Sequence, residues 1–98
     1  MAELILKTSQ PERAEAVIKQ AIAAKFARME YSQQQARKRL DYFEQKYHVT
    51  SEQFISEWAA EDLEGKDVEY VEWAGEYHFF LDMEADLSIL KSIEYIAQ

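Results

Sequence analysis

Apolar residues recur at alternating steps of three and four through the first half of the chain, which is the spacing of one face of an α-helix. The series runs from Val17 to Tyr47, and no strong helix breaker interrupts it after Met29. The pattern predicts helix from Pro11 to Tyr47. It is either one rod of about 55 Å, at ~1.5 Å per residue, or two helices bent near residues 31–32.

The predicted start of this helix has capping chemistry. Ser9 can accept a hydrogen bond from the amide of Glu12, whose side chain can return one. Pro11 fits the first turn, because the N–H that it lacks would have no partner there. Before the helix, Leu4-Ile5-Leu6 form a short apolar run. This run allows a small strand or a segment extended against a helix.

A rod of this length exceeds what the remaining fifty residues can cover. If it is straight, we expect it to self-associate along its apolar seam, as helices with such a repeat do. The seam comprises Ile22, Met29, Ala36, Leu40, Phe43 and Tyr47.

Two further helices are predicted in the second half. Thr50 and Gln53 form a capping box that opens a short helix of about three to four turns. Gly65 is placed where a left-handed residue ends a helix. Asp67 caps the last helix, which is expected from residue 68 almost to residue 98. The fold class is therefore all-α, with a long amino-terminal helix or helical hairpin, one short helix and one long carboxy-terminal helix in a single domain, residues 1–98.

The last helix is apolar around too much of its circumference to bury only one face. At about 100° per residue its apolar side chains fill an arc of roughly 180°, whereas a surface helix needs a little over 100°. Such an arc is expected to contact both its own core and a second chain; the core of a small monomer is the alternative. Gly75 costs about 1 kcal/mol in mid-helix relative to Ala, and close approach of another backbone is the usual compensation. The arc comprises Tyr70, Val71, Trp73, Ala74, Tyr77, His78, Phe80, Leu81 and Ala85.

Composition narrows the class of protein. Two Gly and one Pro supply little turn chemistry, which disfavours a sandwich or a barrel. The absence of Cys removes disulfides, thiolate metal sites and thiol nucleophiles. The start is not basic and no apolar run exceeds four residues, so we expect neither secretion nor a membrane span, and a cytoplasmic location.

Charge is divided unevenly along the chain. Residues 1–48 carry nine bases and six acids, a net of +3, and residues 49–98 carry two bases and thirteen acids, a net of −11. Either the acidic part folds back on the basic part, or it meets a basic partner whose field complements its own. On the second interpretation, residues 1–48 are the self-association part and residues 49–98 the partner-binding part. Only the cluster Arg37-Lys38-Arg39 is suited to phosphate contacts.

No catalytic, cofactor or metal site can be assembled from the sequence. His48 lies near the end of a predicted helix, where capping or exposure is expected. His78 lies on the apolar arc, with Asp82 as its neighbour four residues on. The ligand motifs of di-iron bundles and zinc proteases, phosphate loops and nucleophile elbows are absent. We therefore predict a protein that is not an enzyme and holds no cofactor.

Three segments of the second half carry a family resemblance: KYHVTSEQF at 46–54, DLEGKD at 62–67 and VEWAGEY at 71–77. From about Tyr42 onward, the chain resembles small prokaryotic antitoxins encoded beside a toxin, including the TumA-like group whose partner is a ribonuclease-like toxin. The run Glu-Trp-Ala-Gly-Glu-Tyr is the most specific element.

The resemblance implies an antitoxin that neutralises a basic toxin by covering its active surface. Aromatic side chains of the last helix would be the anchors, and its carboxylates would supply the complementary charge. Many antitoxins also dimerise and bind their own promoter DNA, for which the basic cluster is the candidate. The predicted partner-binding residues are Glu69, Tyr70, Glu72, Trp73, Glu76, Tyr77 and Phe80, and the predicted DNA-binding residues are Arg37, Lys38 and Arg39.

Two other functions stay open at this point. The order of a strand followed by two helices is similar to that of ribbon-helix-helix repressors, so a small DNA-binding regulator is one alternative. Against it, residues 3–6 offer few side chains that read base edges. A structural coiled-coil module without any toxin is the other alternative.

Overall fold

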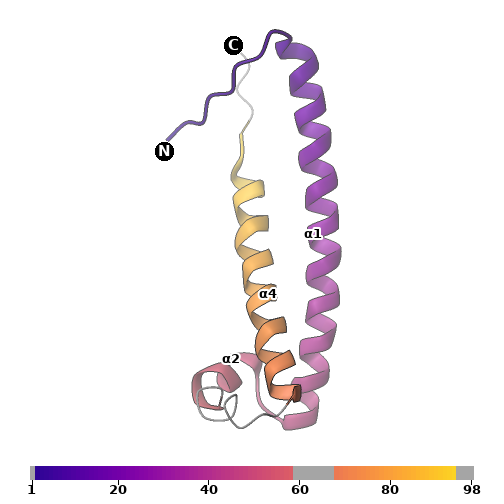
Figure 1. Ribbon diagram of the computed structural model, residues 1–98, viewed down its shortest axis with the longest axis vertical. Coiled ribbons are helices and arrows are strands. Elements are labelled where there is room, and N and C mark those ends of the chain that lie inside the picture. Colours follow the sequence, from indigo (N-terminus) through magenta and orange to yellow (C-terminus); the bar gives the residue numbers. More distant parts are fainter. Residues whose placement is uncertain (1, 59–67, 95–98) are drawn as a thin grey trace.

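The computed structural model describes residues 2–58 and 68–94 (Figure 1). Its elements are helix α1 (Pro11–Tyr47), the single turn α2 (Ser51–Gln53), the π-helical turn η1 (Phe54–Trp58) and helix α4 (Val68–Ser92). α1 and α4 lie side by side and antiparallel, and α2 with η1 lies at the lower end of the pair in Figure 1. The all-α prediction is confirmed, because the described residues contain no strand. Gly65, Asp67 and the segment 62–67 of the family resemblance lie outside the described residues.

α1 is one continuous helix of 37 residues, so of the two predicted forms the single rod is present. The longest dimension of the molecule, 56 Å, is about the length of this helix. Pro11 occupies its first turn as predicted, but the capping box of Ser9 and Glu12 is wrong. Gln10 precedes the helix instead, and its backbone N–H donates to Thr8 Oγ1 at 3.2 Å.

The amino-terminal run Leu4-Ile5-Leu6 forms no strand and does not pack against a helix, since its side chains are 66% to 86% exposed. The prediction of a short strand or packed segment is therefore wrong. A strand needs a partner for its backbone groups, and no other segment of the described chain is extended beside it.

The turn between α1 and α2 follows the local capping signals. His48 ends α1 in the left-handed conformation (φ 59°), and its backbone N–H donates to the carbonyl of Glu44 at 2.9 Å. Thr50 and Gln53 form the predicted capping box, with backbone N–H donors 3.1 and 3.2 Å from their acceptors. The α-helix predicted to follow lasts only to Gln53 and continues as the π-helical turn η1, which brings Phe54 and Trp58 against the same ring of α4, Tyr70.

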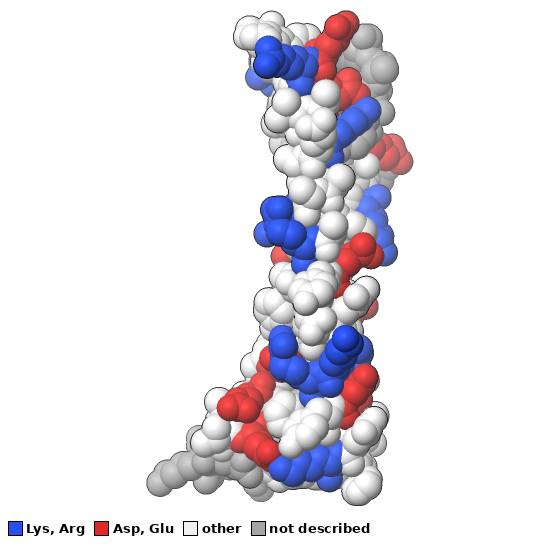
Figure 2. All heavy atoms as spheres, turned by 90° about the vertical axis from the view of Figure 1, so that its right-hand side faces the viewer, with Lys and Arg blue, Asp and Glu red and all other residues white. Residues whose placement is uncertain are grey.

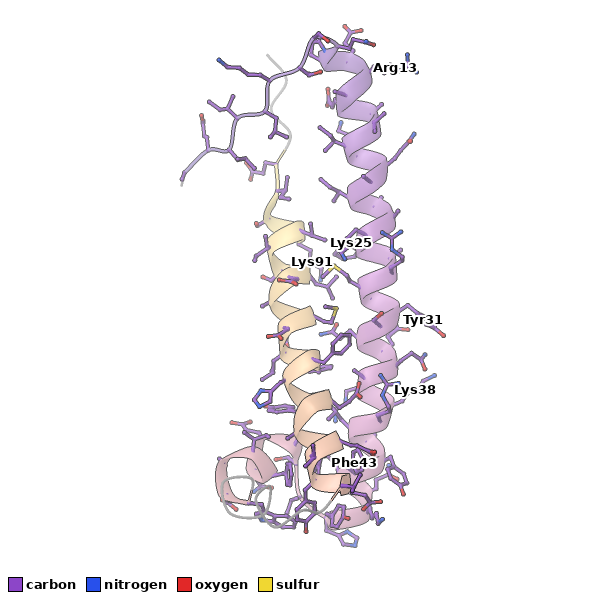
Figure 3. All side chains as sticks on the ribbon, in the orientation of Figure 1. Arg13, Lys25, Tyr31, Lys38, Phe43 and Lys91 are labelled. Atoms are coloured by element: carbon purple, nitrogen blue, oxygen red, sulfur yellow. The ribbon has the colours of Figure 1, made fainter. Side chains whose placement is uncertain are left out.

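The apolar seam of α1 packs against α4 of the same chain. Met29, Ala36, Leu40 and Phe43 are buried in this way, so four of the six seam residues are already covered within one chain, and self-association along the seam stays a prediction. The main cluster of buried residues lies at the lower end, where Leu40 and Phe43 meet Phe54, Trp73 and Ala74. α4 ends at Ser92, short of the predicted end. Near this end the Lys91 Nζ lies 5.7 Å from the centre of the Phe26 ring. The first turns of α1 extend beyond the end of α4 (Figures 1 and 3).

The resulting molecule is elongated. Its radius of gyration is 18.9 Å, whereas a compact domain of this length has about 13 Å. Two helices side by side leave much of each helix facing outward. Among the described residues, no helix combines the length and the hydrophobicity that crossing a membrane requires.

Candidate functional site

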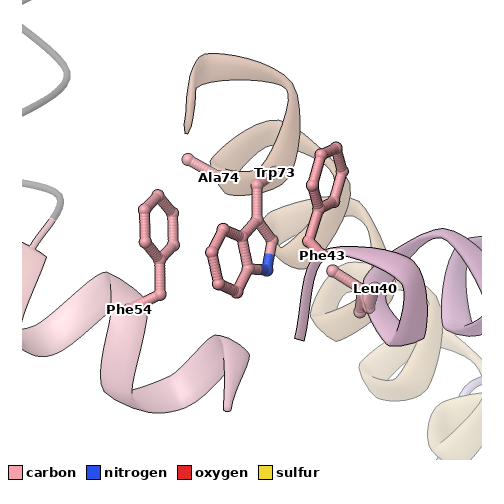
Figure 4. Packing of buried hydrophobic residues seen from close by; sticks show 5 residues of the cluster. All are labelled: Leu40, Phe43, Phe54, Trp73 and Ala74. Atoms are coloured by element: carbon pink, nitrogen blue, oxygen red, sulfur yellow. The ribbon is translucent and has the colours of Figure 1, made fainter. Parts of the chain in front are cut away.

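Trp73, the predicted anchor for a partner, lies at the centre of the protein's own core. Its side chain is fully buried, with the ring of Phe54 stacked on it at 3.9 Å between centres and 5° between planes (Figure 4). Phe43 and Tyr47 of α1 stack nearly parallel to the indole as well, at 5.6 and 5.5 Å. Trp73 therefore joins three elements of one chain and presents no surface to another. Its assignment as a partner-binding residue is wrong for this conformation.

The remaining aromatic residues of the predicted row are half-buried. Tyr70 lies between Tyr47 and Phe54, with ring centres 5.4 Å from each. Tyr77 and Phe80 also pack against the cluster, and the Arg37 guanidinium lies over the Phe80 ring at 5.4 Å. The aromatic row therefore serves the fold first. The wide apolar arc is divided among α1, α2 with η1, and solvent.

Two of the three predicted carboxylates pair with bases of α1. Arg39 donates to Glu76 at 2.6 Å and Lys46 donates to Glu69 at 2.6 Å. Tyr47 donates a further hydrogen bond to Glu69. The hydrogen bond from Lys46, and then that from Tyr47, lowers the pKa of Glu69. At these two positions the acidic part of the chain folds back on the basic part, as the first of the two interpretations of the charge pattern expects.

The basic cluster is divided in the same way. Arg37 donates to Asp41 at 2.9 Å and to Glu44 at 2.7 Å, and Arg39 is held by Glu76. Lys38 is exposed and takes part in none of the ion pairs of the described residues. Other bases recur along this side of the molecule, with carboxylates among them from its upper to its lower end (Figure 2). The three predicted DNA-binding residues therefore do not form one free basic surface.

A buried polar relay connects the three elements, and it was not predicted from the sequence. The Trp73 indole N–H donates to Ser51 Oγ at 2.9 Å, and Ser51 is 1% exposed. Ser51 donates from both its hydroxyl and its backbone N–H to Glu44 Oε2, at 2.7 and 2.8 Å, while Arg37 donates to the other oxygen. Partial burial acts to raise the pKa of Glu44, but the hydrogen bonds from Ser51 and Arg37 outweigh it, so the pKa is lowered.

The candidate site is an exposed surface of α4 that lies beside the contact with α1 and borders a groove between the two helices, and we call it the outer face. It combines exposed aliphatic and aromatic side chains with exposed carboxylates; Phe79 is 40% exposed and Val71 is 52% exposed. The ion pairs of the described residues leave Glu72, Asp82 and Asp86 without a basic partner. At about 100° per residue the members of this face lie within roughly 100° of one another. The outer face comprises Val68, Val71, Glu72, Gly75, Phe79, Asp82 and Asp86.

Gly75 lies at the middle of this face, and none of the described residues uses its small size. A Cβ added to it would meet no atom within 4 Å, so residues 2–58 and 68–94 do not make the close approach predicted for this glycine. Beside it a groove of about 680 Å³ runs between α4 and α1, with Tyr42 and Lys38 on one side and Val71 and Glu72 on the other. The outer face thus has an open backbone position next to a hollow.

Most of this face was not predicted from the sequence, because the predicted apolar arc is centred on Trp73. Of the predicted partner-binding residues, only Glu72 belongs to the outer face. The available signal was the recurrence of Val68, Gly75, Phe79 and Asp82 at steps of three, four and seven on the side opposite Trp73.

The outer face has no grouping of metal-binding side chains among the described residues. Within residues 2–58 and 68–94, no three His, Asp or Glu side chains are grouped so as to hold a metal ion. Compared with known proteins, the chain matches no family model, no curated protein and no solved structure.

Proposed function

We propose that this chain is a small interaction protein of the antitoxin type, which binds a basic partner protein through the outer face of α4. The observation that carries the proposal is the combination, on one helix face, of exposed apolar side chains with carboxylates that have no basic partner in the described residues. The apolar groups would supply binding free energy, and the carboxylates would select a basic surface and speed encounter.

The charge balance of α4 supports a basic partner over a second copy of the same face. α4 carries six acids and one base, and α1 neutralises Glu69 and Glu76. Two outer faces brought together would place Asp82 and Asp86 of both copies in one interface. Like charges in such a contact are unfavourable, whereas a partner that carries Lys or Arg at the matching positions would neutralise them.

Gly75 supports a close contact at the middle of the face. A glycine in mid-helix costs about 1 kcal/mol relative to alanine, and this one gains no packing in return from the part of the chain that the structure describes. A partner backbone seated against Gly75 would use the missing side chain, as glycine does where two backbones approach closely. The antitoxin role itself rests on the family resemblance of residues 46–54 and 71–77, and the geometry supplies a surface on which such a role could operate.

The test begins with neighbouring reading frames. Each product is expressed alone and together with this chain, and we expect one basic product whose expression arrests growth and whose effect this chain relieves. Binding of the purified pair is then measured by calorimetry in increasing salt, where the affinity should fall because charges are screened.

Matched variants locate the binding surface. Phe79→Glu and Gly75→Ala should each weaken binding about tenfold or more, while Leu81→Glu, at a comparably exposed position outside the outer face (41% against 40%), should leave it unchanged. The proposal is wrong if no neighbouring product is toxic, or if the outer-face variants bind as tightly as the wild type. Salt-sensitive binding of duplex DNA in place of a protein would favour the regulator instead.

A further inference from the structure

A second surface of α4 is neither covered by α1 nor part of the outer face. The second surface is the continuation of the apolar arc of α4 toward the carboxyl end of the helix. The amino-terminal part of that arc is covered by α2 and η1. There Tyr70 contacts Phe54 and Trp58, and Ala74 is buried. Above Ala74 the cover ends, and Leu81 and Ile89 are 41% and 61% exposed. We call this surface the lateral stripe, and it comprises His78, Leu81, Ala85, Ser88, Ile89 and Ser92.

The lateral stripe carries no carboxylate, although α4 has six acids in 25 residues. At about 100° per residue its members fill an arc of roughly 100° in which no Asp or Glu falls, with Asp82 and Glu84 at its two borders. For a chain with a net charge of −8, contact between two copies is least unfavourable where acids are absent from the contact itself. The lateral stripe meets this condition, and the outer face does not.

The surface area of the chain leaves room for such a contact. Its accessible surface is 7845 Å², whereas a compact monomer of its mass, 11.5 kDa, exposes about 5,800 Å². The excess of about 2,000 Å² is spread over the whole elongated chain, and it is larger than the roughly 800 Å² that each partner buries in a stable interface of standard size. One further helix-to-helix contact can therefore form without opening the existing fold.

We infer that the lateral stripe of α4 pairs with the same stripe of a second copy, in an antiparallel contact about a two-fold axis near Ala85. Leu81 and Ile89 lie four residues on either side of Ala85, so each Leu81 faces Ile89 of the second copy. Small residues along the stripe, Ala85 and Ser88 among them, let the two helices approach. The border carboxylates stay in water at the edges of the contact.

This self-association uses none of the residues of the proposed partner binding, because the two surfaces are adjacent on α4, meet near Asp82 and have no member in common. Their salt dependences are opposite in sign. Added salt screens the repulsion between two chains of charge −8 and strengthens the pairing, whereas it weakens binding of a basic partner. The failure of one proposal therefore leaves the other standing.

The experiment measures the mass of the full chain by sedimentation equilibrium from about 1 µM to about 1 mM. The expected mass rises from 11.5 kDa toward about 23 kDa, twice the mass of one chain. The double variant Leu81→Glu/Ile89→Glu should stay at 11.5 kDa with the helical circular dichroism of the wild type. The control variant Phe79→Glu, on the outer face, should associate as the wild type does.

A second measurement does not depend on disrupting the stripe. The chain has no cysteine, so a single Ala85→Cys substitution introduces one thiol. Under mild oxidation Ala85→Cys should form a disulfide-linked dimer, whereas Glu72→Cys on the outer face should not. A wild-type mass of 11.5 kDa at every concentration would overturn the inference. Association lost in Phe79→Glu but kept in the double variant, or cross-linking at residue 72 and not at residue 85, would overturn it too.

Discussion

The relay from Trp73 through Ser51 to Glu44 predicts a large effect from a very small change, Ser51→Ala. The substitution removes one oxygen atom from a residue that is 1% exposed. In the wild type the Trp73 indole N–H lies 2.9 Å from the Ser51 hydroxyl oxygen, in a site that water does not reach. The substitution leaves this N–H without a hydrogen-bond partner. It also removes the 2.7 Å hydrogen bond that the Ser51 hydroxyl donates to Glu44.

The magnitude follows from these two losses. A buried donor left unsatisfied costs about 1–3 kcal/mol, and a hydrogen bond to a charged group contributes about 1.5–3 kcal/mol. Glu44 keeps its bonds from Arg37 and from the Ser51 backbone N–H, so the second loss lies at the low end. We expect Ser51→Ala to lower the free energy of unfolding by about 2–4 kcal/mol, a large fraction of the stability of a domain of this size.

Urea unfolding, followed by far-ultraviolet circular dichroism at one fixed chain concentration, measures this effect. Ser56→Ala is the matched control, because Ser56 donates only an exposed bond of 3.2 Å to the carbonyl of Gln53 and should change stability by less than about 0.5 kcal/mol. A double-mutant cycle with Trp73→Phe, which removes the indole donor, should give a coupling of about 1 kcal/mol or more. A Ser51→Ala effect no larger than that of the control, or strict additivity in the cycle, would refute the role assigned to the relay.

Two further predictions concern single positions. Gly75→Ala should raise the free energy of unfolding by about 1 kcal/mol, because alanine favours the helix and its Cβ meets no atom within 4 Å; a lower urea midpoint would contradict this. The pKa of Glu44 is lower in the folded chain than its ordinary value of 4.5, so its stabilisation is complete above that pH and is lost as the pH falls through the folded value. The stability difference between the wild type and Glu44→Gln should therefore shrink between pH 7 and pH 3, and a constant difference would contradict the argument.

Features set by neighbours in sequence could be predicted from the sequence. The spacing of apolar residues gave α1 its full length, and the capping box of Thr50 and Gln53 lies where the side-chain chemistry placed it. Ser9 and Glu12 have the same spacing and the same kinds of side chain, but their box did not form, and Gln10 precedes the helix instead. Capping chemistry thus identified that a helix begins near Pro11, but not which residue caps it.

Features set by tertiary contacts could not be predicted in this way. Trp73 and Val71 belong to the same apolar arc in the sequence, yet one is fully buried and the other is half exposed. The difference arises because η1 folds Phe54 onto the indole, and nothing in the periodicity of α4 indicates on which side that segment packs. Ser51 gave no signal either, because a serine just after a helix cap is usually exposed to solvent.

The distribution of side chains around α4 bears on how an aromatic-rich acidic helix should be interpreted. Trp and Tyr are enriched at interfaces. A hairpin of two helices, however, has few residues with which to build a core, and in this chain the largest aromatic rings form that core. The charges follow the same division, because the carboxylates nearest α1, Glu69 and Glu76, pair with its bases and the more distant ones do not. The side chains of α4 that can contact a partner are therefore those that the fold does not use. They are the exposed aliphatic side chains, Phe79 and the carboxylates that have no basic partner. The partner surface is therefore placed on the Gly75 side of α4 and not on the Trp73 side. Gly75→Ala should stabilise the fold and weaken binding, so it separates the two roles more cleanly than any substitution of Trp73.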